Sequence, residues 1–198
     1  KDDIKRLELV RSAWDAYHPD YMKFNLRENP DFHKDFASGA VMLGATVTEL
    51  AGDVSGKDLL DVCCAGDATQ AFSWANLGAE VTACDISPVA IKIARENAEI
   101  IGLPLVFQVA DAQTLVPIEN ESFDIVFATD LGWYENIRLA CQNWYRVLRP
   151  GGRLLIDTFH PLTSCLVDVD GHIFQERSYN DRSPDYRDFN GTPLSRQH

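Results

Sequence analysis

The chain has 198 residues, of which 45% are hydrophobic and 24% charged, proportions typical of one globular domain with a buried core. Its formal charge of −12 argues against long nucleic-acid contacts, because these depend on lysine and arginine side chains that neutralise phosphates. No apolar run approaches the roughly 20 residues of a membrane span, and five scattered cysteines are not a disulfide framework. We therefore expect a cytoplasmic protein that binds neither nucleic acid nor membranes.

The N-terminal residues predict two helices. One helical face carries apolar side chains at Ile4, Leu7, Val10, Trp14 and Tyr17. Pro19 is expected to end this helix, because proline removes a helix hydrogen bond. A second helix is expected over about 34–51. We expect His18 and His33 to be exposed or to flank helices, without partners.

Five apolar runs follow, and each predicts a buried strand because Val, Ile, Leu and Phe recur in it without alternation. They are residues 58–63, 79–85, 105–111, 123–130 and 152–159. Helical patterns separate them, one of which has Ser87 as its N-cap and Gly102 as its end. Strands that alternate with helices predict an α/β fold, Rossmann-like and doubly wound, with a mostly parallel sheet and helices on both faces. Beyond the fifth run, only residues 172–179 look like a strand.

The stretch "DVCCAGDATQ", residues 61–70, joins the first strand to a helix. Adjacent cysteines do not suit a tetrahedral metal site or a CxxC redox pair, so we interpret Cys63 and Cys64 as packing residues and expect no metal. A turn at Gly66 remains, and Asp85 ends the next strand nineteen residues later. A carboxylate about 20 residues beyond a glycine turn is the spacing of a nucleotide site, in which the acid binds a ribose hydroxyl.

Five motifs over residues 59–161 together resemble the class I S-adenosylmethionine-dependent methyltransferases. The matching stretches, in the family's order, are "LLDVCCAGDATQ", "VTACDIS", "VADAQTL", "SFDIVFATDLGWYENI" and "RVLRPGGRLLIDTFHP". The first motif departs from the family's D-x-G-x-G-x-G pattern, because Ala65 and Ala68 stand where glycines are expected. The family's sheet also normally ends with two further strands, and we cannot place them in residues 162–198.

This resemblance implies S-adenosyl-L-methionine as cofactor and S-adenosyl-L-homocysteine as product. By analogy with the family, Asp85 binds the ribose, Ile86 lies against the adenine, and Asp111 with the backbone of Ala112 faces the adenine amino group. The expected cofactor-binding set is Asp61, Cys63, Ala65, Gly66, Asp85, Ile86, Asp111, Ala112 and Thr129. Asp61 has the alternative of anchoring the loop backbone without touching the ligand.

The acceptor is expected to be a small molecule methylated on O or N, with oligomeric state left open. Asp130 and His160 follow the fourth and fifth strands and are candidates for catalysis. The alternative for Asp130 is a cap on the helix that begins near Glu135, and the alternative for His160 is a hydrogen-bonded structural histidine. Tyr17, Tyr21 and Trp133 are candidate substrate-binding residues, with core packing as the alternative. Aromatic and apolar walls are typical of small-molecule sites.

The domain boundaries follow from these motifs. Residues 1–57 are interpreted as a helical cap or lid, 58–161 as the cofactor-binding core, and 162–198 as a substrate lid or a truncated C-terminal segment. Two other functions remain open. One is a NAD-dependent oxidoreductase, which shares the glycine turn and the acid. The other is a non-catalytic, degenerate methyltransferase-like module.

Overall fold

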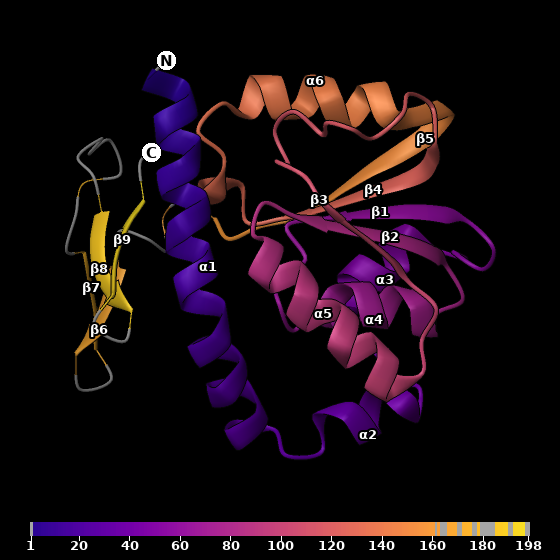
Figure 1. Cartoon of the computed structure of the whole chain (residues 1–198), viewed down its shortest axis with the longest axis horizontal. Coiled ribbons are helices and arrows are strands. Elements are labelled where there is room, and N and C mark those ends of the chain that lie inside the picture. The colour runs from indigo at the N-terminus through magenta and orange to yellow at the C-terminus, as the bar shows by residue number, and fades with distance from the viewer. Residues whose placement is uncertain are drawn as a thin grey trace.

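The structure, a computed structural model, contains a five-stranded parallel sheet with the order β3-β2-β1-β4-β5 (Figure 1). It describes residues 2–160, 162, 166–169, 172–175, 178, 185–189 and 192–196. The sheet strands are β1 (Asp58–Val62), β2 (Glu80–Asp85), β3 (Val106–Val109), β4 (Phe123–Thr129) and β5 (Leu148–Asp157). The predicted α/β fold with a mostly parallel sheet is therefore confirmed.

Helices cover both faces of this sheet. On one face lie α4 (Thr69–Asn76) and α5 (Pro88–Ile101), and α6 (Ile137–Val147) covers the other (Figure 1). Neighbouring strand residues point to opposite faces, so Leu59 packs in the first hydrophobic cluster and Leu60 in the second, each 0% exposed. This two-sided burial explains why the strands are nearly continuous apolar runs.

The N-terminal helix is longer than predicted. Helix α1 (Asp2–Glu28) continues through Pro19, although proline inside a helix costs about 3 kcal/mol. Its second half makes tertiary contacts that offset this cost: Met22 is buried in the core, and Tyr21 and Asn25 donate hydrogen bonds to Asp67. The expectation that Pro19 ends the helix was wrong because these contacts lie far away in the sequence.

The single helix expected over about 34–51 is two short helices, α2 (Phe32–Ala37) and α3 (Ala45–Ala51). The chain turns between them at Gly39, which has a φ of 93°. The amide of Asn76 donates to the carbonyls of Phe36 and Ala40 at 3.0 and 2.8 Å, so the helix end is satisfied from α4 rather than by a continuing helix.

Two antiparallel hairpins follow the sheet. They pair β6 (Leu166–Val169) with β7 (His172–Gln175), and β8 (Asp185–Phe189) with β9 (Thr192–Arg196). The sequence predicted a single strand here, over 172–179, whereas the described residues also form β6, β8 and β9. None of the described residues adds a further strand to the main sheet at β5. Much of the predicted lid or truncated segment, 162–198, lies outside the described residues. Among the residues that are described, no helix is both long and apolar enough to cross a membrane.

Candidate functional site

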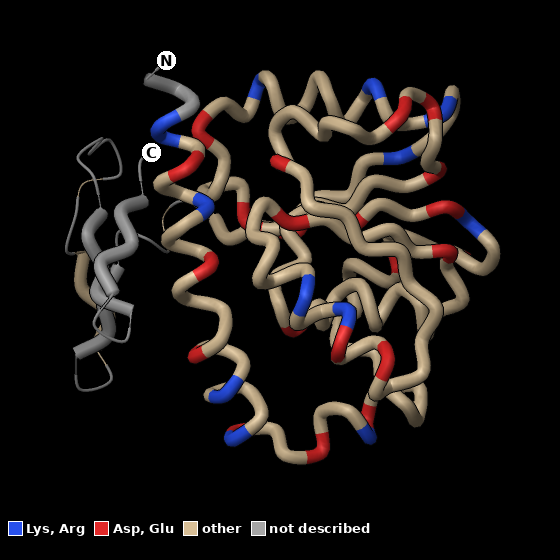
Figure 2. The backbone as a smooth tube through the Cα atoms, viewed as in Figure 1, with Lys and Arg blue, Asp and Glu red and all other residues tan. Residues whose placement is uncertain are grey.

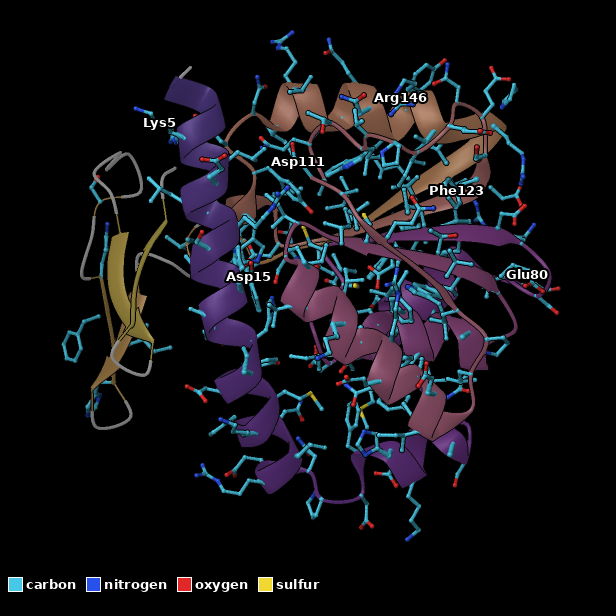
Figure 3. All side chains as sticks on the ribbon, viewed as in Figure 1. Lys5, Asp15, Glu80, Asp111, Phe123 and Arg146 are labelled. Carbon is cyan, nitrogen blue, oxygen red and sulfur yellow. The ribbon has the colours of Figure 1, made fainter. Side chains whose placement is uncertain are left out.

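A cavity of about 770 Å³ lies at the carboxyl ends of the strands, enclosed on one side by α1. Parallel strands end at the same edge of a sheet, and open α/β sheets bind their ligands there. The cavity collects side chains from α1 and from the segments that follow β1, β2, β3 and β4. Figure 3 labels residues from two of its surrounding segments: Asp15 on α1 and Asp111 after β3.

Most of the residues singled out from the sequence line this cavity. They are Tyr17, Tyr21, Cys63, Ala65, Asp85, Ile86, Asp111, Ala112, Thr129 and Trp133. Four others, namely Asp61, Gly66, Asp130 and His160, are not among the described residues that line it. The fold thus brings together residues as far apart in sequence as Tyr17 and Trp133.

The loop after β1 has a strained backbone. Cys63, Ala65 and Ala68 adopt positive φ angles of 63°, 57° and 47°. This left-handed conformation costs a residue other than glycine roughly 1–2 kcal/mol. The loop therefore follows a glycine-type path at the two alanines that replace expected glycines. Cys64 is buried, as expected for packing, whereas Cys63, which the family resemblance also placed in the cofactor-binding set, lines the cavity.

Asp85 ties this loop to the end of β2. Its two carboxylate oxygens accept hydrogen bonds from the backbone N–H of Ser87, at 2.9 Å, and of Ala65, at 3.1 Å. The side chain is 7% exposed, and burial raises its pKa to about 6. Asp85 also lies on the cavity wall, and a carboxylate oxygen can accept more than one hydrogen bond.

Asp111 has a similar position after β3. One oxygen accepts from the backbone N–H of Gln113 at 3.0 Å and the other from the hydroxyl of Thr114 at 3.1 Å. The neighbouring carbonyl of Ala112 accepts from the indole N–H of Trp144 at 2.9 Å, which fixes this segment against α6. The acid and the backbone beside it are thus held in place on the cavity wall.

Asp67 lines the cavity and was missed in the sequence. One of its carboxylate oxygens accepts hydrogen bonds from the Tyr21 hydroxyl at 3.1 Å, the Asn25 amide at 3.0 Å and the Thr69 hydroxyl at 3.1 Å. The side chain is 8% exposed, and burial raises its pKa. A signal was present, because Asp67 follows Gly66 directly and Tyr17, Tyr21 and Asn25 recur at helical spacing on α1.

Aromatic rings of α1 form another wall. Trp14 packs edge-on against Trp133 with ring centroids 5.2 Å apart, and Tyr17 stacks on Tyr21 at 5.4 Å. Trp133 is 38% exposed, so it is not a core tryptophan. His18, expected to be exposed or to flank a helix, lies within α1 and is buried against Trp14, and burial lowers its pKa to about 4. It is therefore neutral near pH 7.

The second histidine expectation was also wrong. The Nε2 atom of His33 lies 2.8 Å from the amide oxygen of Asn97, so His33 joins α2 to α5. The partner was missed because Asn97 lies 64 residues away in the sequence.

The two catalytic candidates make local contacts. Asp130 accepts a hydrogen bond from the backbone N–H of Gly132 at 3.2 Å and caps the short 3₁₀ helix η1 (Leu131–Trp133). Its alternative, a cap on the helix that begins near Glu135, was wrong, because Asn136 caps α6 by accepting from the backbone N–H of Leu139. His160 is exposed, and its Nδ1 atom accepts from the backbone N–H of Leu162 at 3.2 Å. Neither contact directs a side chain into the cavity.

Acidic groups dominate the charge of the site. The described lining includes the carboxylates of Asp67, Asp85, Asp111 and Glu135, and Figure 2 shows acidic residues where the strands face α1. The guanidinium of Arg6 also lines the cavity, but it lies 2.6 Å from Glu135 in an ion pair. Behind the loop, the carboxylate of Asp61 is 1% exposed, and its Oδ2 atom has no partner among the described residues. The site thus has an excess of buried acceptors and suits a cationic ligand rich in donors.

Comparisons with known proteins agree with this geometry. Residues 60–156 match the family model described as "Methyltransferase domain". This part of the chain belongs to the class I S-adenosylmethionine-dependent methyltransferase family, and the resemblance noted in the sequence is confirmed. The family implies S-adenosylmethionine as the cofactor, and the cationic sulfonium and ammonium groups of that molecule fit the acidic cavity.

Curated relatives match the chain at moderate identity. Demethylmenaquinone methyltransferase of Thermus thermophilus is 36% identical over 57% of this chain and 52% of its own length. Ubiquinone biosynthesis O-methyltransferase of Xanthomonas oryzae is 32% identical over 54% of this chain and 45% of its own. The chain thus spans about half the length of these relatives.

A solved structure supports the fold. The S-adenosylmethionine-dependent methyltransferase from Mesorhizobium loti superposes with a TM-score of 0.59 at 20% identity, covering 70% of this chain and 65% of that one. At this identity the similarity concerns the fold alone.

Proposed function

We propose that the chain is an S-adenosylmethionine-dependent methyltransferase that transfers a methyl group to O or N of a small-molecule acceptor. The observation that carries this proposal is the acidic cavity at the strand ends, closed by α1. S-adenosylmethionine bears a sulfonium and an ammonium against one carboxylate, so it is a net cation. NAD bears an anionic pyrophosphate, and a cavity lined by Asp67, Asp85 and Asp111 disfavours it.

Within this proposal, the nucleoside half of the cofactor lies over β2 and β3. We assign Asp85 to the ribose hydroxyls, Ile86 to an adenine face, and Asp111 with Ala112 to the adenine amino edge. Cys63 and Ala65 of the loop after β1 form the floor, with Thr129 at the end of β4. We assign Asp61 of β1 and Gly66 to the support of this loop, because neither is among the described residues that line the cavity. Family membership and the common cavity support these assignments.

When bound, the cofactor supplies an activated sulfonium methyl group. The residues of the chain hold the acceptor in line with that methyl group and exclude water, and such orientation accounts for up to roughly 7–11 kcal/mol of barrier reduction. We assign the acceptor wall to Tyr17, Tyr21 and Trp133, which face the cavity with Trp14. The proposal gives Asp130 and His160 no proton-transfer role, because neither lines the cavity among the described residues.

A small acceptor is supported by two observations. The cavity volume of about 770 Å³ is in the range of small-molecule sites. The two relatives are named for demethylmenaquinone and for ubiquinone biosynthesis, so their names also concern small molecules.

Calorimetric titration with S-adenosylhomocysteine, with NAD as the control, tests the proposal. We expect micromolar binding of the first and no binding of the second. Binding of NAD alone would indicate the oxidoreductase, and binding of neither would favour a non-catalytic module. After a positive result, methyl transfer from S-adenosylmethionine to a panel of phenolic and amine acceptors measures the activity itself.

A further inference from the structure

Asp67 is a buried acid for which the nucleoside assignments provide no ligand group. It lies on the cavity wall, 8% exposed, and its hydrogen-bond donors Tyr21, Asn25 and Thr69 are all neutral. Among the described residues, no lysine, arginine or histidine forms an ion pair with it. A buried carboxylate without a cation is unfavourable, and a positively charged ligand group would relieve that cost.

Resting on the proposed function, we propose that Asp67 binds the α-ammonium group at the amino-acid end of the cofactor, and that Tyr21 and Asn25 of α1 position its carboxylate. The helix thereby contributes to recognition of the cofactor, in addition to enclosing the cavity.

The strand order supports this placement. Strands β3, β2 and β1 are consecutive in the sheet, and Asp111, Asp85 and Asp67 follow them in the same order. A ligand with its adenine near Asp111 and its ribose at Asp85 extends across the strand ends. Its remaining end then reaches the loop after β1, where Asp67 lines the cavity.

The other acids near the cavity are less suited to this role. Asp85 stands at the ribose position, and Asp111 is turned toward Gln113 and Thr114 at the adenine position. Asp61 is not among the described residues that line the cavity. Asp67 therefore combines exposure to the cavity with proximity to α1.

The hydrogen bonds from α1 also explain how the carboxylate is directed. Tyr21, Asn25 and Thr69 all donate to the Oδ2 atom, which fixes the side-chain torsion. These donors come from both sides of the loop, one from α4 and two from α1. An arrangement that fixes orientation without neutralising charge is the one expected of a preorganised cation site.

The test compares ligands that differ only at the amino-acid end. Calorimetry would measure the affinities of S-adenosylhomocysteine, of its analogue with hydrogen in place of the amino group, and of 5′-methylthioadenosine, which lacks the amino-acid end. With the unaltered protein, we expect the deaminated analogue to bind about 10- to 100-fold more weakly than S-adenosylhomocysteine, the loss typical of a hydrogen bond to a charged group. This comparison needs no variant to fold.

The matched variant is Asp67→Asn, which keeps an oxygen for Tyr21 and Asn25 but removes the charge. We expect it to weaken S-adenosylhomocysteine about 10- to 100-fold and to change methylthioadenosine by less than about twofold. In this variant, S-adenosylhomocysteine and its deaminated analogue should bind with similar affinity, because the interaction between the amino group and the carboxylate is already lost. This comparison completes a double-mutant cycle. As a control, Asp111→Asn should weaken both nucleosides to a similar extent.

The outcomes separate the two proposals. If S-adenosylhomocysteine does not bind the unaltered protein, the proposed function fails, and this assignment fails with it. If it binds, but deamination or Asp67→Asn leaves its affinity unchanged, only the assignment of Asp67 is overturned. Equal losses for S-adenosylhomocysteine and methylthioadenosine in Asp67→Asn would also overturn it, because they would indicate a structural role in docking α1.

Discussion

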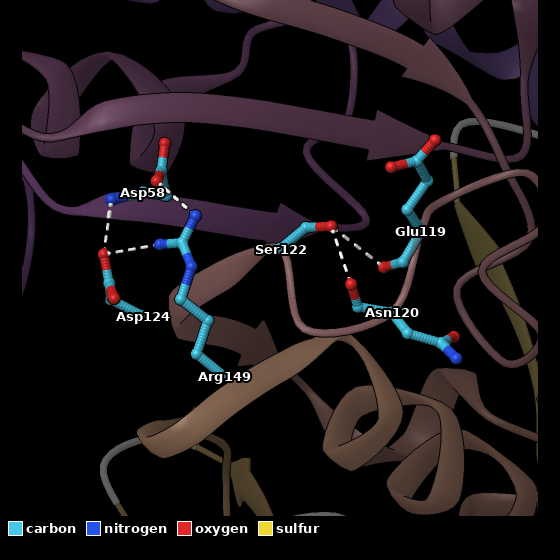
Figure 4. Close-up of polar contacts among 6 residues, drawn as sticks. All are labelled: Asp58, Glu119, Asn120, Ser122, Asp124 and Arg149. Atoms are coloured by element: carbon cyan, nitrogen blue, oxygen red, sulfur yellow. Dashed lines mark hydrogen bonds and ion pairs between the residues drawn. The ribbon is translucent and has the colours of Figure 1, made fainter.

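Charged side chains at the two ends of the central sheet differ in whether they form ion pairs within the chain. At the amino end, the guanidinium of Arg149 lies 2.7 Å from Asp58 and 3.0 Å from Asp124, and Asp124 also accepts the backbone N–H of Asp58 (Figure 4). At the carboxyl end, Asp67 and Asp85 are buried, and neither forms an ion pair among the described residues. At the amino end, charges are paired within the chain. They are left to an external partner where a ligand is expected.

The backbone shows the same contrast. Before β1 and β2, the positive φ angles of 67° and 90° belong to Gly56 and Gly78, which adopt them without strain. In the loop after β1, the positive φ angles belong to Cys63, Ala65 and Ala68. At the amino end, Glu121 before β4 also has a positive φ of 50°, so the contrast is one of degree: the single loop after β1 holds three such residues. Backbone strain clusters at functional sites, which is consistent with a ligand site beside this loop.

Removing the charge at the ribose position should give the largest effect. We expect Asp85→Ala to lower the affinity for S-adenosylhomocysteine tenfold or more, because about 1.5–3 kcal/mol of charge-assisted hydrogen bonding is lost. Calorimetry measures the affinity, and circular dichroism with a thermal melt controls for folding. An unchanged affinity would remove Asp85 from the ribose assignment.

Lowering the pH should reproduce part of this effect. Burial raises the pKa of Asp85 to about 6 from 3.8, so the free folded protein takes up this proton more readily than the unfolded chain does. The contribution of Asp85 to stability therefore decreases as the pH rises from about 4 to 6. The affinity for the ligand should depend on pH in the opposite direction and increase as the pH rises, because the ionised carboxylate is the better acceptor for a hydroxyl.

We accordingly expect the affinity for S-adenosylhomocysteine to be constant above about pH 7. Between pH 6 and 5 it should fall by up to tenfold, because the Asp85 carboxyl group must release one proton before the ligand binds. Asp85→Asn is the control, because its affinity at neutral pH is low already and should vary less over this range. A wild-type profile that is flat from pH 7 to 5 contradicts the assignment.

Relieving the strained loop should have an intermediate effect on stability. Ala65 has a φ of 57°, and glycine adopts this conformation freely, so Ala65→Gly should raise the free energy of unfolding by about 0.5–1 kcal/mol. Urea denaturation measures this change. Ala75→Gly in α4 is the matched control and should lower stability by about 1 kcal/mol, since its backbone is helical. Destabilisation by both variants would refute the strain argument.

The smallest effect is expected at the paired end of the sheet. Arg149→Gln should decrease stability slightly, because the ion pairs with Asp58 and Asp124 are solvent-exposed. The affinity for S-adenosylhomocysteine should stay unchanged, and 0.5 M salt should reduce the difference in stability between the variant and the wild type. A loss of ligand affinity here would show that the two ends of the sheet are coupled.

The sheet could be predicted from sequence because its signals are local. Each strand is a short apolar run, and the turn at Gly66 and the acid Asp85 fall at the spacing of a nucleotide site. The polar contacts across the amino end, including those of Ser122 with the carbonyls of Glu119 and Asn120 in Figure 4, have no comparable pattern.

The contribution of α1 could not be predicted in the same way. Pro19 is a strong local signal for a helix end, but burial of His18 and the bonds from Tyr21 and Asn25 to Asp67 depend on residues more than 40 positions away. The stripe formed by Tyr17, Tyr21 and Asn25 crosses the proline, and continuing it would have indicated a longer helix. The length of α1 is therefore determined by its tertiary contacts rather than by the intrinsic helix propensity of its residues.

Because α1 encloses the cavity and also holds Asp67 in place, attachment of this helix and occupancy of the site are linked equilibria. A ligand that binds only when α1 is attached stabilises that attachment by mass action, by about 2.7 kcal/mol at a concentration 100 times its dissociation constant. Backbone amides of the helix should therefore exchange with deuterium more slowly when the site is filled. Equally, changes on the outer face of α1 that loosen its attachment would weaken ligand binding without touching the cavity, since such coupling is reciprocal.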